Sequence, residues 1–130
     1  MPDITETIVF HKSIANSDTG TLEYPIPYDC HVVRIQYFFA RNQQNLLQVD
    51  VKVAGQSVQK YEKNSNAYMV GDGYEIDVRC YTEGKAEQKL QCWYNNADAD
   101  DPKTLFVVVH ILRKLTPEEA DKIAPFKWWM

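Results

Sequence analysis

Residues 46–61 read LLQVDVKVAGQSVQKY, and this stretch decides the fold. Apolar and polar side chains alternate along its first half, which places the apolar ones on one face of an extended chain. Residues 54–57 (AGQS) then reverse the chain, because glycine adopts positive φ without a steric penalty. The stretch therefore predicts a β-hairpin with one wet and one buried face, which needs a second apolar layer. The apolar set is Leu47, Val49, Val51 and Val53.

Two further runs predict long strands on either side of this hairpin. Cys30–Phe39 alternates strongly, and strict alternation groups its side chains into two faces. Residues 103–112 are apolar almost throughout, which predicts a central strand covered on both faces. One predicted face of the first run is Val33, Ile35, Tyr37 and Phe39; the other is Val32, Arg34, Gln36 and Phe38.

Shorter strands complete an all-β pattern. Pro25 and Pro27 cannot donate ladder hydrogen bonds, so the strand that ends there belongs at a sheet edge or corner. The turn signals between strands have the spacing of a sandwich or barrel. The prediction is an antiparallel β-sandwich, a jelly roll of about eight strands. The shorter strands are expected at residues 5–12, 21–26, 67–70, 74–80 and 90–94.

The chain changes character at Thr116. The sequence TPEE there supplies an N-cap threonine, a proline at the first helical position and a glutamate at the third. A short helix over residues 117–123 is predicted, followed by an aromatic tail. We therefore expect a β-sandwich domain at residues 1–115 and a C-terminal appendage at 116–130 that is not an independent domain.

Composition excludes several classes of function. The chain has 130 residues, of which 45% are apolar and 25% charged, as in a soluble globular domain. The net charge of −4 leaves no basic stripe for nucleic acid. No apolar run is long enough to span a bilayer, and the amino terminus lacks the features of a secretion signal. Three cysteines do not form a disulfide framework, so synthesis in a reducing cytoplasm is expected.

No catalytic constellation is recognisable, and the sequence predicts no enzyme, cofactor or metal site. Cys80 and Cys92 are expected on inward faces as reduced core thiols, with a cross-strand disulfide as the alternative. Cys30 has no candidate partner. The three histidines show no ligand spacing, and a cupin-like metal site would need them on facing strands with a carboxylate nearby. One of them is expected to be an interior, hydrogen-bonded residue. These are His11, His31 and His110, the last being the interior one.

Residues 95–101 read NNADADD and crowd carboxylates and amides together. Oxygen-rich loops of this kind can hold calcium, but the EF-hand spacing and its closing glutamate are missing. A solvated loop between strands is the preferred interpretation.

The tail carries the most unusual feature of the sequence. Phe126, Trp128 and Trp129 lie within the last five residues, next to Met130. Exposed rings would form an adhesive patch on a terminal segment. The rings are therefore expected to be buried, either against their own sandwich or by docking into a neighbour. Because tryptophan is enriched among interface anchors, these four residues are predicted to bind a partner.

A family resemblance rests on residues 24–36 (YPIPYDCHVVRIQ) followed by residues 49–58 (VDVKVAGQSV). These segments are similar to the core strands of small jelly-roll capsid decoration, or cement, proteins of tailed bacteriophages. The resemblance implies a non-enzymatic virion protein that is made in the host cytoplasm. It further implies homo-oligomers that bind the major capsid protein or another virion subunit and stabilise the shell. No cofactor and no individual site residue is implied.

The alternative is a carbohydrate-binding sandwich, lectin-like or a phage tail and receptor-binding component. Outward rings would stack on sugars, with Asn95 and Asp98 nearby. The candidate rings are Trp93, Tyr81 and Phe38. A cupin-like metal enzyme is a third reading, and it requires a bound metal.

Overall fold

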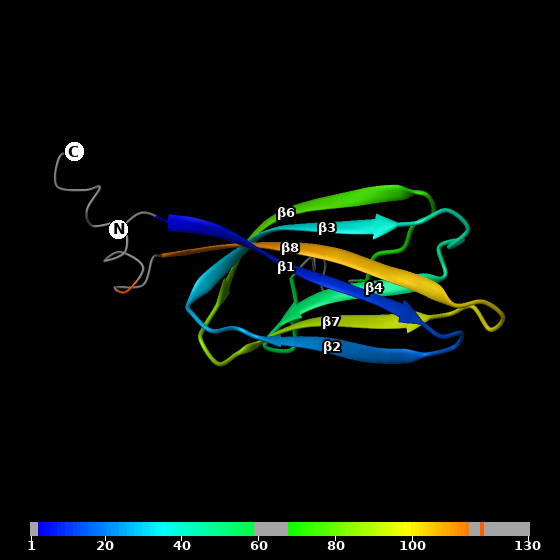
Figure 1. Ribbon diagram of the computed structural model, residues 1–130, viewed down its shortest axis with the longest axis horizontal. Coiled ribbons are helices and arrows are strands. Elements are labelled where there is room, and N and C mark those ends of the chain that lie inside the picture. Colours follow the sequence, from blue (N-terminus) through cyan, green and yellow to red (C-terminus); the bar gives the residue numbers. More distant parts are fainter. Residues whose placement is uncertain (1–2, 59–67, 115–117, 119–130) are drawn as a thin grey trace.

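A computed structural model describes residues 3–58, 68–114 and 118 of the chain. The described residues form eight strands and no helical element (Figure 1). The all-β prediction is therefore confirmed. The strands are β1 (Asp3–Ile14), β2 (Thr19–Pro25), β3 (Cys30–Phe39), β4 (Leu47–Val53), β5 (Gln56–Ser57), β6 (Tyr74–Gly84), β7 (Lys89–Asn96) and β8 (Lys103–Lys114).

The strands pair into two four-stranded antiparallel sheets, with strand orders β1-β8-β3-β6 and β2-β7-β4-β5. Successive strands alternate between the two sheets, except that β4 and β5 form a hairpin within one sheet. The sheets lie on either side of a common core, so the predicted β-sandwich is confirmed. The edge position predicted for the proline-bounded strand is also confirmed, because β2 lies at the end of its sheet.

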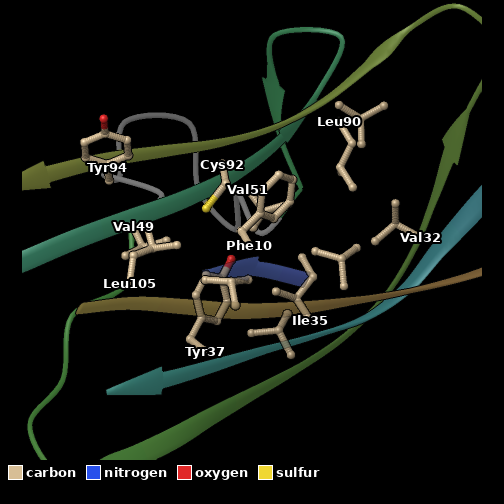
Figure 2. Close-up of a cluster of buried hydrophobic side chains, with 14 of the residues drawn as sticks. Phe10, Val32, Ile35, Tyr37, Val49, Val51, Leu90, Cys92, Tyr94 and Leu105 are labelled. Carbon is tan, nitrogen blue, oxygen red and sulfur yellow. The ribbon is translucent and has the colours of Figure 1, made fainter. Parts of the chain in front are cut away.

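The core fills the space between the sheets, and both sheets contribute to it. Figure 2 shows Val49, Val51 and Cys92 from one sheet directed toward Ile35 and Tyr37 from the other. Burying each such aliphatic side chain contributes roughly 1.5–3 kcal/mol to folding. A single layer could not cover these residues, which is why the hairpin predicted the second sheet.

The β4–β5 hairpin follows the prediction in its buried face and in its turn. Leu47, Val49, Val51 and Val53 are all buried. Ala54 and Gly55 have φ of 52° and 82°, and Val53 pairs directly with Gln56. Positive φ at both central residues gives a two-residue turn whose twist matches that of the strands. The return strand is short, and Tyr61 lies outside the described residues.

The predicted faces of β3 are wrong in its first half. Cys30 and Val32 are buried together with Ile35, whereas strict alternation placed Val32 and Ile35 on opposite faces. The reason is a bulge between Val32 and Arg34, where the register shifts against both neighbouring strands. One extra residue in a strand inverts the alternation beyond it.

The predicted coverage of β8 on both faces is also wrong. Its inward residues, including Leu105, Val107 and Val109, are buried. Its outward residues Phe106 and Val108 are only half-buried, on the outer face of the β1-β8-β3-β6 sheet. Among the described residues, no further layer covers that face. The continuous apolar run therefore reflects one core face and one apolar outer surface.

The described part of the chain contains no helix long and apolar enough to cross a membrane. The predicted helix over residues 117–123 lies outside the described residues, apart from one position. The tail residues Phe126, Trp128, Trp129 and Met130 lie outside them entirely.

Candidate binding surface

Aromatic side chains cluster on the outer face of the β1-β8-β3-β6 sheet. Phe38 from β3 packs edge to face on Phe106 from β8, with 5.1 Å between ring centroids. His11 from β1 lies on the other side of Phe106, also at 5.1 Å. Cross-strand register explains the row, because Phe106 pairs with His11 across the β1–β8 ladder. Three neighbouring strands thus present one line of rings to the outside.

This row borders an open hollow of about 540 Å³, which we call the aromatic hollow. Its volume lies within the range typical of ligand pockets. Tyr74 forms one wall with 52% of its surface exposed, and Phe38 is 36% exposed. The Gly73 amide donates a 3.0 Å hydrogen bond to the Ala40 carbonyl, which joins the two loop ends that border the hollow. Three rings and one cation are prominent among the residues that line it: Phe38, Tyr74, Phe106 and Arg41, with Gly73 and Thr104 beside them.

Glycine is required at one position beside the hollow. A Cβ atom on Gly71 would lie 2.6 Å from Phe39 Cδ2, closer than atoms of neighbouring residues approach. The Gly71 carbonyl accepts a hydrogen bond from the Asn45 amide. Gly71 therefore packs directly against the Phe39 ring and fixes the position of the segment that leads to Tyr74. This backbone packing shapes one side of the hollow.

A second hollow, of about 320 Å³, lies near the opposite end of β3 and β8. Tyr81 is 69% exposed and stacks on His31, with ring centroids 4.1 Å apart and an angle of 12° between the planes. Two carboxylates and two cations surround this pair. They are Asp29, Glu83, Arg113 and Lys114.

The three rings proposed to bind sugar do not share a surface. Phe38 and Tyr81 lie in one sheet but border different hollows. Trp93 belongs to β7 in the other sheet, half-buried. There it contacts the Lys52 ammonium at 6.0 Å and the Tyr68 ring at 6.4 Å. A single platform built from all three rings is therefore excluded by their placement.

One carboxylate of the acidic loop, that of Asp98, is bonded to neighbouring parts of its own chain. The Asp98 carboxylate is buried and lies 3.0 Å from Lys103 Nζ. Its Oδ1 atom accepts hydrogen bonds from the amides of Asp100 and Asp101. These bonds lower the pKa of Asp98, the Asp100 amide first and the Lys103 ammonium next. The interpretation as a solvated loop is wrong for Asp98, although Asp100 and Asp101 are exposed.

The histidines lie on the outer face of one sheet. His110 is only half-buried, so its predicted interior position is wrong, but it is hydrogen-bonded as expected. Its Nε2 atom lies 2.6 Å from Gln36 Oε1. Desolvation and, next, the Arg34 guanidinium lower the pKa of His110. Within residues 3–58 and 68–114, no group of three or more histidine, cysteine or acidic side chains is arranged to hold a metal ion.

The three cysteines are free thiols in the structure, as predicted. Cys80 lies in β6 and Cys92 in β7, so the two belong to different sheets. Burial raises the pKa of each thiol, most strongly for Cys92. All three are therefore protonated side chains at neutral pH, and none has the lowered pKa of a cysteine nucleophile.

Sequence reasoning missed most of the aromatic hollow. Alternation singles out Phe38, but the apolar run that contains Phe106 predicts a covered strand, and Tyr74 is not among the candidate rings. The signal that could have indicated the hollow is the apolar character of both faces of residues 103–112. Only one face of such a strand packs on the core, so the other is left as an apolar surface. No sequence signal places Gly73 beside Ala40.

The fold and this surface define a two-layered antiparallel β-sandwich with an aromatic outer face. No family model matches the chain, and the search of curated proteins found no match.

Proposed function

We propose that this chain is a non-enzymatic structural virion protein, a jelly-roll decoration protein that binds the outside of a capsid shell and reinforces it. The strand orders support the jelly roll. β1-β8-β3-β6 facing β2-β7-β4-β5 is the arrangement that two interleaved Greek keys produce from eight strands. Jelly rolls are common in capsid proteins, lectins and cupins, so the fold alone does not select among them.

The observation that carries the proposal is an exposed apolar strip on the outer face of the β1-β8-β3-β6 sheet, where Val9, Val108 and Phe106 lie on neighbouring strands. Val9 is 54% exposed there, beside the half-buried Val108 with which it pairs. Contiguous exposed apolar surface on a folded domain marks an interaction site. Each large apolar side chain buried at a contact contributes roughly 1.5–3 kcal/mol, and symmetric copies on a shell repeat that contribution. In this proposal the sandwich is a rigid block that attaches through this face.

Partner and location follow from the same proposal. The partner is the major capsid protein or another virion subunit, and the protein is made in the host cytoplasm and carried in the virion. The tail residues Phe126, Trp128, Trp129 and Met130 add contacts between copies.

A co-sedimentation assay with shells that lack this protein tests the proposal. We expect the wild-type chain to pellet with shells and the Val9→Lys variant to bind at least about tenfold more weakly, because a charge must be desolvated at the contact. Thr21→Lys is the matched control, an exposed residue on edge strand β2 of the opposite sheet. Equal binding of both variants, or no binding of the wild type, contradicts the proposal.

The carbohydrate-binding alternative retains one specific observation. The exposed ring of Tyr81 is held flat by His31 beside the Glu83 and Asp29 carboxylates, and aromatic rings next to carboxylates suit sugar recognition. A glycan array tests it. A ligand that is lost in Tyr81→Ala and kept in Trp93→Ala supports a sugar site at the second hollow, whereas an array without any ligand removes this alternative.

A further inference from the structure

We propose that the aromatic hollow receives the C-terminal tryptophans of a second copy of this chain, so that copies are linked tail to hollow. This inference deepens the proposed function, on which it rests for the expectation of oligomers. It assigns the hollow one occupant, the segment that contains Phe126, Trp128 and Trp129.

The hollow fits an indole ring in its chemistry. Phe38 and Phe106 meet edge to face and Tyr74 is half-exposed, so an inserted ring finds both faces and edges of other rings. Aromatic pairs of this kind contribute beyond the burial of their area. A buried indole N–H needs an acceptor, and the Thr104 hydroxyl at the rim can supply one.

The tail needs such a site. Its three large rings fall within five residues, and the chain holds only three tryptophans, two of which are in this tail. Trp93, the third, lies on the opposite sheet. Rings left in water would make the tail adhesive to any apolar surface. The aromatic hollow is more apolar than the second hollow.

The reach of the tail favours a second copy over the same protomer. The tail begins after Lys114, at the end of β8, whereas Thr104 lies ten residues earlier. Ten strand residues span about 34 Å. The 14 residues from position 115 to Trp128 reach at most about 48 Å when fully extended. A return along its own β8 would need a reversal and then nearly full extension of the chain, whereas the hollow of a neighbouring copy carries no such constraint.

A contact of this kind is heterologous, because a tail on one copy meets a hollow on the next. Heterologous contacts build closed rings when the rotation closes and open filaments when it does not. Mixing a variant with a damaged hollow and a variant with a damaged tail should therefore allow one contact per pair of chains. A copy with an intact tail and a damaged hollow can still link to a copy with an intact hollow and a damaged tail.

Sedimentation velocity on full-length chains tests this relationship. The hollow variant is Phe38→Thr with Tyr74→Thr, two exposed positions where threonine keeps the strand preference. The tail variant is Trp128→Ser with Trp129→Ser. We expect wild-type oligomers that grow with concentration, monomers for each variant alone, and a 1:1 mixture of the variants that doubles the sedimenting mass and stops there.

Tyr81→Thr is the control, since it removes an exposed tyrosine from the same strand, β6, at the second hollow. It is expected to assemble like the wild type. Circular dichroism and thermal unfolding establish that each variant is folded. A wild-type chain that stays monomeric, variants that keep wild-type oligomers, or a mixture that stays monomeric overturns the inference.

The shell assay separates this inference from the proposed function. Complementation without any binding to shells supports the tail-to-hollow link and contradicts the decoration role. Binding to shells by a chain whose variants fail to complement contradicts the link alone.

Discussion

The Lys103 ammonium lies 3.0 Å from the Asp98 carboxylate, and both side chains are less than one tenth exposed. Lys103 also donates to the Asn42 carbonyl at 3.0 Å. The pair therefore ties the β7–β8 connection to the β3–β4 loop beside the aromatic hollow. A buried ion pair persists only when its remaining polar atoms are also bonded, and here the amides of Asp100 and Asp101 complete the set.

This pair predicts acid sensitivity. The pKa of Asp98 is lowered in the folded protein, so the unfolded chain takes up the proton at a higher pH than the folded chain. The stability that Asp98 contributes is therefore present above its ordinary pKa near 3.8 and is lost as the pH falls through and below that value. We expect Asp98→Asn to have a lower Tm than the wild type at pH 7, with the two Tm values converging toward pH 3.

Thermal unfolding monitored by circular dichroism between pH 7 and pH 3 measures this convergence. Glu23→Gln is the control, because Glu23 forms an exposed ion pair with Lys89 at 2.9 Å. Exposed pairs contribute little, so its Tm curve should follow that of the wild type. A constant gap between Asp98→Asn and wild type across the whole pH range would count against the assigned cause.

Asn96 is predicted to be the most sensitive polar side chain in the same region. It is fully buried, and its Nδ2 atom donates to the carbonyls of Ala15 and Asp101 at 3.2 and 3.0 Å. Asn96→Ala also removes two buried bonds, to the Ile14 carbonyl and from the Asp98 amide, and this costs about 1–3 kcal/mol of unfolding free energy. Urea unfolding measures the loss. Asn95→Ala, the outward neighbour that donates to Gln48, should cost less than about 0.5 kcal/mol.

Leu90 is predicted to report on the shared core. Its side chain is fully buried on the inward face of β7, whereas the next residue, Gln91, is directed outward. Leu90→Ala should lower the unfolding free energy by about 2–5 kcal/mol because it removes apolar contact and leaves a cavity. Gln91→Ala should change it by less than about 0.5 kcal/mol. Similar losses for the two variants in chemical denaturation would contradict the assignment of the faces.

The thiols are predicted to be unreactive in the folded protein. Desolvation raises the pKa of Cys92, with a further contribution from Asp50, and desolvation likewise raises that of Cys80. Because the thiolate is the reactive form, a disulfide reagent at pH 8 should label the native protein at least about tenfold more slowly than the unfolded chain. Three equivalents are expected in guanidinium chloride. Fewer than three, in the absence of reductant, would indicate a disulfide.

The aromatic hollow shows why part of the candidate site escaped prediction. Alternation along the strand predicts that Phe38 is directed outward. The structure agrees, because Phe38 is exposed and its neighbour Phe39 is buried in the core. It did not place Phe106 beside Phe38, because their contact joins strands that lie far apart in the sequence. The bulge at Val33 likewise has no local signature, and it reversed the predicted faces for half of β3.

By itself the sequence determined the all-β class, the apolar face of the central hairpin, the tight turn at Ala54-Gly55 and the edge position of the proline-bounded strand. Each of these follows from the period of the side chains or from the allowed φ of one or two residues, which are local properties. Only the tertiary structure decided the strand order, the aromatic hollow and the burial of Asp98 against Lys103. Those features depend on which distant segments become neighbours, and pairing across the sheets is a collective outcome that no single stretch encodes.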